Sequence, residues 1–144
     1  MKNKKLLRIR PTIRLTLVLV LTVISSSTAA LAVRQYKVAT LPERTLRKWA
    51  KITVMPVFPT ESKNRKSQGV AVAEVQIDEL GNVSKVEVLE APDPPIAKAL
   101  IVAIKQWKFE PGKDDSDGKP IRMQGKLTFY FVIEGQTAQV KNPN

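Results

Sequence analysis

The 144-residue sequence contains no cysteine and no histidine. Without cysteine the chain cannot form a disulfide, a thiolate nucleophile or a cysteine-ligated metal site. Without histidine it also lacks the commonest general base and the commonest transition-metal ligand. A Ser-His-Asp triad and a histidine-rich zinc site are therefore excluded, and only carboxylate, Lys, Tyr or Ser/Thr chemistry remains.

Acidic residues are absent from the first part of the chain, where basic residues gather. The formal net charge is +11, and six basic residues precede the first apolar run: Lys2, Lys4, Lys5, Arg8, Arg10 and Arg14. Without residues 1–32 the excess of basic over acidic side chains falls to 5. The sequence also lacks a Gly-rich aromatic motif of the kind that binds RNA. We therefore do not predict nucleic acid as a partner.

Residues 1–32 have the layout of a secretory signal. The basic head is followed by the apolar run LTLVLVLTVI and then by small residues that end in Ala30-Leu31-Ala32. This order favours an exported chain that is cleaved at the A-x-A site. The alternative is an uncleaved anchor, because residues 15–33 approach the length that spans a bilayer. In both cases the rest of the chain faces a non-cytosolic compartment.

Residues 33–52 form a basic connector that can be helical. The stretch TLPERTLRKWAKI has a proline near its start, and Leu46, Trp49 and Ala50 fall on one side of a helix. Basic residues, among them Arg47, occupy much of the remainder. Such a helix can lie on an anionic membrane surface, but we favour a helix that docks Trp49 on the following domain.

Residues 53–135 alternate between strand and helix patterns. Alternating apolar residues predict strands over 70–78, 83–90 and 121–135, and Gly81 suits the hairpin turn between the first two. An apolar arc predicts a helix over 94–107, and residues 60–68 read as a short polar helix or turn. The predicted fold class is α+β, with about three antiparallel strands and one main helix, plus the short helix, packed on one face. Residues 136–144 are predicted to be a polar tail.

The order of these elements and two short motifs suggest a family. VFP at residues 57–59 contains Phe58 and Pro59, and QWKFEP at residues 106–111 places two aromatics and a proline at alternate positions. Trp107 and Phe109 are predicted to fill the core, and Pro111 prevents the helix from restarting. With the hairpin turn DELGNV, the ordered set over residues 56–133 resembles the C-terminal domain of the TonB family of energy transducers.

The resemblance implies a periplasmic binding module. Domains of that family grip a short extended segment, the TonB box, of outer-membrane receptors by adding it as a strand to their own sheet, in energy-dependent transport. An exposed sheet edge offers unpaired N–H and C=O groups to such a segment. Strand 121–133 is the best candidate edge, and the candidate docking residues are Met123, Gln124, Lys126, Thr128 and Tyr130. The alternative for each of them is an ordinary solvated position on the sheet.

Two features depart from the family's pattern. Its transducers carry a functional histidine in a membrane helix and a long Pro-rich spacer, whereas this chain has no histidine. Residues 33–55 can reach at most about 80 Å when fully extended. The alternative function is therefore an accessory or structural envelope protein that uses the domain for periplasmic protein contact. Pairing of two exposed edges would give a homodimer, and an anchored form would associate with the inner membrane.

A metal site is a poor fit to the acidic loop. Asp114, Asp115 and Asp117 lie close together, and carboxylate oxygens can bind Mg²⁺ or Ca²⁺. The stretch DDSDGKPIR lacks the closing glutamate of a calcium loop, so a solvated turn is favoured. We predict neither a cofactor, a metal ion nor an enzymatic activity.

Overall fold

The computed structural model describes residues 36–143. The predicted signal or anchor and the first residues of the connector lie outside the described residues. None of the helices among residues 36–143 is long and apolar enough to cross a membrane.

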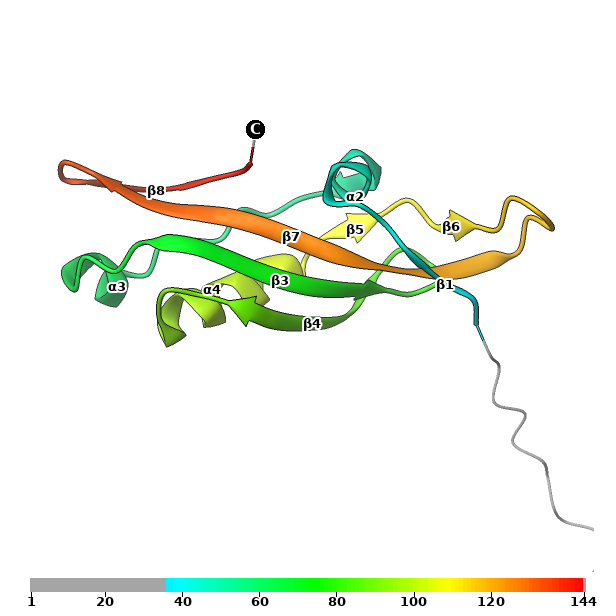
Figure 1. The fold of residues 1–144 in the computed structure, drawn as a ribbon, viewed down its shortest axis with the longest axis horizontal. Helices are drawn as coiled ribbons and strands as arrows, with labels where there is room; N and C mark the ends of the chain where they lie inside the picture. Colours follow the sequence, from blue (N-terminus) through cyan, green and yellow to red (C-terminus); the bar gives the residue numbers. More distant parts are fainter. Residues whose placement is uncertain (1–35, 144) are drawn as a thin grey trace, which may run out of the picture. The chain divides into compact units, whose positions relative to one another are not determined.

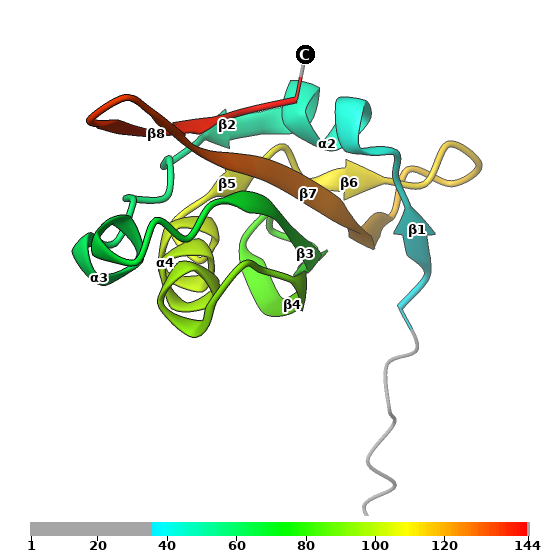
Figure 2. The same ribbon diagram turned by 60° about the vertical axis from the view of Figure 1, so that its left-hand side comes forward.

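The described chain folds into a sheet with helices packed around it (Figures 1 and 2). In chain order the elements are β1 (Val38–Thr40), α2 (Glu43–Trp49), β2 (Ala50–Ile52), α3 (Thr60–Asn64), β3 (Gly69–Ile77), β4 (Val83–Glu90), α4 (Pro94–Ile104), β5 (Lys108–Phe109), β6 (Gly112–Lys113), β7 (Pro120–Glu134) and β8 (Thr137–Lys141). Strands β7, β3 and β4 are neighbours in that order and run antiparallel. Figure 1 shows these three long strands side by side, with β4 outermost.

The prediction of about three strands is wrong in number, because eight strands occur within residues 36–143. Strand β1 runs parallel to β7, and β8 forms a hairpin with β7. Strand β6 also pairs with β7, and β2 pairs with β5 in a separate two-stranded sheet. These added strands have two to five residues. Alternation over so few residues carries little signal, so these short strands could not be predicted from the sequence.

The apolar face of the sheet and helix α4 enclose the core. On β3 and β7, alternate residues from Ala71 to Ile77 and from Met123 to Phe131 are buried. Helix α4 adds Ile96, Leu100, Ala103 and Ile104 from one side of its surface. The opposite face of the sheet carries the polar residues of β7 and is left to solvent, as the strict alternation requires.

The aromatic motif residues tie the segments together. Trp107 and Phe109 are 1% and 2% exposed, and the Trp107 indole Nε1–H donates to the Val54 carbonyl at 2.8 Å. The Phe58 ring meets the Phe131 ring edge-on, with centroids 5.4 Å apart. The aromatic residues of the two motifs thus hold the extended chain before α3 in contact with the end of α4 and with β7.

Asp93 is the N-cap of helix α4, and its carboxylate also contacts Ser62 in helix α3. Its carboxylate accepts hydrogen bonds from the Ile96 backbone N–H at 2.9 Å and the Ser62 hydroxyl at 3.0 Å, and it pairs with Arg65 at 3.1 Å. Burial raises the pKa of Asp93, but the hydrogen bonds from Ile96, Ser62 and Arg65 outweigh burial and lower the pKa from 3.8 to about 2. The charged form therefore stabilises the fold.

We expect Asp93→Ala to lower the free energy of unfolding by about 1 kcal/mol at pH 7, as for other N-caps. Because the folded pKa is depressed, the charge-dependent part is present above pH 3.8 and is lost as the pH falls toward about 2. Asp93→Asn is the matched control, since asparagine also caps helices but does not titrate. Urea unfolding at pH 7 and pH 2.5 measures this. An equal gap between wild type and Asp93→Asn at both pH values would contradict the assignment.

Candidate functional site

Strand β7 is paired with β3 on one side, and large parts of its other side are covered as well. Strand β3 pairs with residues 123–131 of β7 on one side. On the other side, which we call the outer side of β7, β1 pairs with residues 122–124 and β8 pairs with residues 130–134. The prediction that strand 121–133 is an open edge is therefore wrong for residues 122–124 and 130–134, which are already paired. The connector and the predicted tail both fold back onto the strand, and alternation within a strand does not report its neighbours.

The even-numbered residues of β7 direct their backbone groups to the outer side. The Arg122 N–H donates to the Lys37 carbonyl at 3.0 Å, and the Leu41 N–H donates to the Gln124 carbonyl at 2.8 Å. Backbone groups alternate in direction along a strand. The N–H and C=O of Lys126 therefore also point outward, and no hydrogen bond from residues 36–143 reaches them.

Two side chains of helix α2 take the place of a neighbouring strand at Thr128. The Glu43 carboxylate accepts from the Thr128 backbone N–H at 2.8 Å and from its hydroxyl at 2.9 Å. The Arg47 guanidinium donates to the Thr128 carbonyl at 2.6 Å and pairs with Glu43 at 2.8 Å. It also lies over the Phe129 ring, 5.0 Å from the centroid. The outer backbone groups of Thr128 are thus satisfied without a strand.

The lack of a side chain at Gly125 allows α2 and the residue before it to lie close to β7. A Cβ atom at this position would lie 2.5 Å from the Leu41 carbonyl oxygen and 2.5 Å from Leu46 Cδ1. Leu46 is fully buried and belongs to the core. Trp49, which the sequence favoured as the docking residue, is partly buried against the same core. The helix does dock on the domain, with Leu46 as its buried anchor.

Strand β8 is held to β7 by backbone pairing, by contacts of the Gln139 and Lys141 side chains with Glu134, and by Val140, which packs against the core. It pairs Lys141 with Tyr130, Gln139 with Val132 and Thr137 with Glu134. None of its five residues is fully buried. The link to β7 is only two residues long and starts with Gly135 at φ 61°. A short terminal strand with no fully buried side chain is typical of segments that open at low free energy.

The five candidate docking residues therefore have different surroundings. Met123 is 1% exposed and belongs to the core. Gln124 lies beside β1, Thr128 is held by α2, and Tyr130 is 38% exposed beside β8. Lys126 is exposed between the two covered stretches. The sequence did not point to Glu43 and Arg47, although their i,i+4 spacing is typical of an ion pair on a helix.

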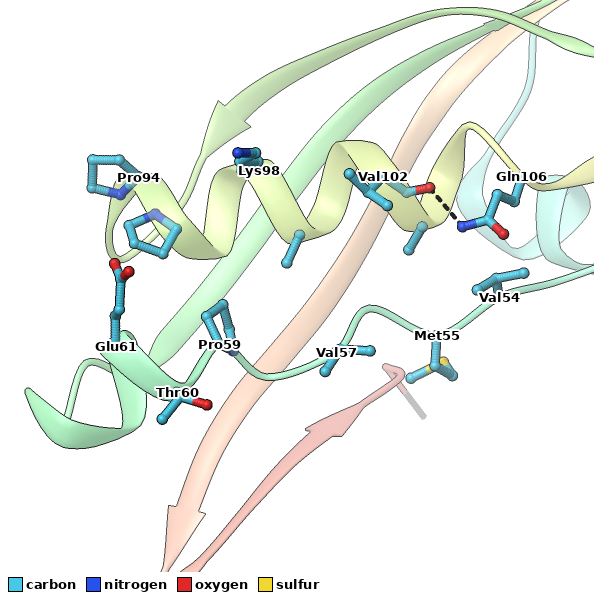
Figure 3. A pocket seen from close by; sticks show the side chains of 13 residues that line it. Val54, Met55, Val57, Pro59, Thr60, Glu61, Pro94, Lys98, Val102 and Gln106 are labelled. Atoms are coloured by element: carbon cyan, nitrogen blue, oxygen red, sulfur yellow. Dashed lines mark hydrogen bonds between the residues drawn. The ribbon is translucent and has the colours of Figure 1, made fainter.

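An apolar groove separates α4 from the extended chain before α3 (Figure 3). Its volume is about 670 Å³, and Val57 and Val102 on its two walls are 78% and 55% exposed. Figure 3 shows the polar side chains Glu61 and Gln106 at opposite ends of the groove. Gln106 follows the end of α4, and its side-chain amide donates to the Val102 carbonyl in the last turn of the helix at 3.0 Å. The groove walls thus present mainly aliphatic surface.

The acidic loop is engaged in contacts with its neighbours. Asp114 accepts from the Lys37 ammonium at 2.6 Å and from the Ser116 hydroxyl at 2.7 Å, and Asp117 pairs with Lys119 at 2.7 Å. The Lys37 hydrogen bond holds the pKa of Asp114 well below its usual value. Within residues 36–143 no three acidic side chains gather in a way that could hold a metal ion. The loop instead ties the chain before β1 to the sheet.

Comparison with known proteins places this arrangement in a family. The family model described as "Gram-negative bacterial TonB protein C-terminal" matches residues 54–133, which is more than half of the chain. The chain belongs to this family. The resemblance seen in the sequence is therefore confirmed, and so is the prediction that the chain is not an enzyme.

Two relatives extend the comparison. The chain is 30% identical over 83 residues to Protein TonB of Vibrio cholerae serotype O1, which covers 57% of this chain and 33% of that protein. The chain thus spans about a third of the length of this curated relative. The solution NMR structure of the Pseudomonas aeruginosa TonB CTD matches with a TM-score of 0.52 and 26% identity, over 67% of this chain and 94% of that one. The fold is that of a TonB C-terminal domain.

Proposed function

We propose that this chain is a periplasmic TonB-family module that docks an extended, TonB-box-like segment of an outer-membrane receptor on the outer side of β7. The main support for this proposal is the pairing of β8 with β7. Strand β8 occupies the outward backbone groups of Tyr130, Val132 and Glu134, which a bound peptide strand would need. A peptide that pairs with the same groups recovers the hydrogen bonds that β8 loses. Strand β8 thus acts as an internal competitor for the docking edge.

Helix α2 sets one end of this docking edge. Because Glu43 and Arg47 hold both outer backbone groups of Thr128, an added strand that leaves α2 in place pairs with residues 130–134. The uncovered groups of Lys126 extend the edge only when the ion pair of α2 moves aside. Of the five candidate docking residues, Tyr130 is thus the principal one in this proposal.

A proline at position 132 tests the docking edge. Val132 pairs with β8 alone, since the pairing with β3 stops at Phe131. Val132→Pro therefore removes one outward N–H at little cost to the rest of the sheet. We expect a folded protein that binds a labelled TonB-box peptide about tenfold more weakly.

The controls separate backbone from side-chain effects. Val132→Ala keeps the N–H and should bind like wild type, and Lys126→Ala should change the binding free energy by less than about 1 kcal/mol. A chain that ends at Gly135 lacks β8 and should bind more tightly, because its edge is already free. Fluorescence titration, with circular dichroism as the folding control, gives the affinities. A folded Val132→Pro variant with unchanged affinity would refute docking at this edge.

A second candidate is an accessory envelope protein without energy transduction. It is favoured by the absence of histidine from the sequence and by the outer side of β4, with which no strand within residues 36–143 pairs. In this alternative the domain holds another periplasmic protein or a second copy of itself. Failure of every TonB-box peptide to bind both the wild type and the chain that ends at Gly135 would favour it.

A further inference from the structure

The C-terminal end of β8 meets helix α2 (Figure 2). The pairing of β8 with β7 ends at Lys141, which lies opposite Tyr130. The side-chain Oδ1 of the next residue, Asn142, accepts a hydrogen bond from Nη1 of Arg47 at 3.0 Å. A side chain of α2 therefore contacts the first residue after the paired part of β8, the strand that competes for the docking edge.

The Arg47 guanidinium is held in place by groups that do not belong to β8. Its Nε donates to the Glu43 carboxylate at 2.9 Å, and its Nη2 donates to the Thr128 carbonyl at 2.6 Å. Its Cζ also lies 5.0 Å from the centroid of Phe129 and 5.9 Å from that of Trp107. A guanidinium presents its N–H donors in a fixed plane. Nη1 therefore keeps its direction when β8 leaves, and it offers a donor to any strand that takes the place of β8.

The side chain that Arg47 contacts lies on the apolar face of the sheet. Side chains two residues apart on a strand share a face, so Asn142 continues the face of Val140. Val140 packs against the core, and Arg47 lies over Phe129 on the same face. A strand that replaces β8 in this position directs one side chain to the core at the place of Val140. It directs the side chain two residues away toward Arg47.

The charges around Asn142 favour a carboxylate at this place. A cavity of about 590 Å³ is lined there by Glu43, Arg44, Arg47 and Pro143. Arg47 pairs with Glu43, whereas Arg44 is exposed and forms no ion pair among residues 36–143. Two guanidinium groups against one carboxylate leave one positive charge unbalanced. A hydrogen bond from a guanidinium to a carboxylate is also about twice as strong as one to a neutral amide.

We propose that Arg47 determines the specificity of the docking edge by selecting a segment with an aspartate or glutamate at the α2 end. Asn142 is then a weaker, neutral occupant of the same place, so a segment that carries a carboxylate displaces β8 more readily. This inference rests on the proposed docking at β7 and adds the chemistry of the ligand. The ligand is an extended segment with one aliphatic side chain and a carboxylate two residues away from it.

Substitutions at position 142 of the full chain test the selection without a ligand, because β8 is a tethered occupant of the edge. Asn142→Asp supplies the carboxylate, and Asn142→Ala removes the acceptor. Amide hydrogen exchange at Gln139, opposite Val132, reports the opening of β8. We expect this amide to exchange about tenfold more slowly in Asn142→Asp than in wild type, and roughly fivefold faster in Asn142→Ala. Equal exchange in Asn142→Asp and wild type would overturn the proposal.

Substitution of Arg47 shows whether the gain comes from this side chain. In Arg47→Gln, checked for folding by circular dichroism, Asn142→Asp should no longer slow the exchange at Gln139. Arg44→Gln leaves every contact of Arg47 in place and should reduce the tenfold gain about twofold, as for other exposed charges. An undiminished gain in folded Arg47→Gln protein would assign the effect to another group and refute the role of Arg47.

Two labelled peptides separate this inference from docking itself. One has the sequence of residues 137–143, and the other has aspartate in place of Asn142. In a fluorescence titration, the full chain should bind the aspartate peptide about tenfold more tightly. Equal affinities would leave docking intact and refute selection by Arg47. Binding of neither peptide, together with slower exchange in Asn142→Asp, would count against docking at this edge and support the preference of Arg47 for a carboxylate.

Discussion

Trp107→Ala is expected to lower the free energy of unfolding by about 3–5 kcal/mol, as for other buried tryptophans. The indole ring packs edge-on against Phe129 at 6.1 Å and beside Phe109 at 6.0 Å. The indole N–H also donates a hydrogen bond to the Val54 carbonyl, so truncation to alanine leaves both a cavity and an unpaired carbonyl. Since small domains are stable by about 5–15 kcal/mol, the variant should be largely unfolded at moderate denaturant concentration.

Two controls separate the contributions at this position. Trp107→Phe keeps an aromatic ring but loses the indole N–H, and we expect a smaller loss of about 1–3 kcal/mol. Val102 lies in α4, five residues before Trp107, and its side chain is 55% exposed. Val102→Ala should therefore change the free energy of unfolding by no more than about 0.5 kcal/mol. Urea unfolding followed by circular dichroism measures all three. A Trp107→Ala midpoint indistinguishable from that of Val102→Ala would contradict the core assignment.

Gly81→Ala is expected to destabilise the domain by roughly 2–5 kcal/mol, from backbone strain and overpacking together. Gly81 lies in the β3–β4 turn with φ 83°, a conformation that disfavours side chains. Its carbonyl accepts from the Phe109 N–H at 2.8 Å. An added Cβ would collide with the Phe109 carbonyl oxygen, which belongs to the backbone and cannot rotate away.

Gly118→Ala is the matched control for this prediction. Gly118 has a similar φ of 67°, but a Cβ atom there would meet no heavy atom within 4 Å. It should therefore show only the backbone strain of about 1–2 kcal/mol. The difference between the two variants, measured by thermal and urea unfolding, reports the contact between the hairpin turn and the QWKFEP segment. Equal losses in both variants would mean that this contact is not tight.

The long elements could be predicted from the sequence because each carries its own pattern. Alternation over residues 70–78, 83–90 and 121–135 corresponds to β3, β4 and β7, and the apolar arc from Pro94 corresponds to α4. Helix α4 ends at Ile104 rather than at Trp107, because the following residues turn toward β5. The expected helix in the connector is shorter than predicted but present as α2.

The covering of β7 could not be predicted, because it depends on contacts between distant segments. Strands β1 and β8 have three and five residues, too few for a periodic signal. The contact of α2 with Thr128 requires a glycine at position 125. The sequence alone does not distinguish this glycine from any other glycine in a strand. An edge is defined by what lies beside a strand, and sequence periodicity reports only which face of the strand is buried.

Amide hydrogen exchange on the peptide-bound protein tests docking on β7 most directly. In the free protein, the outward backbone groups of β7 and those of β8 are hydrogen-bonded to each other. When a TonB-box peptide saturates the chain, the amide of Gln139 in β8 should exchange much faster. The amides of Tyr130 and Val132 in β7 should remain protected, now by the peptide. Unchanged protection in β8, with new protection at Val86 in β4, would contradict the account.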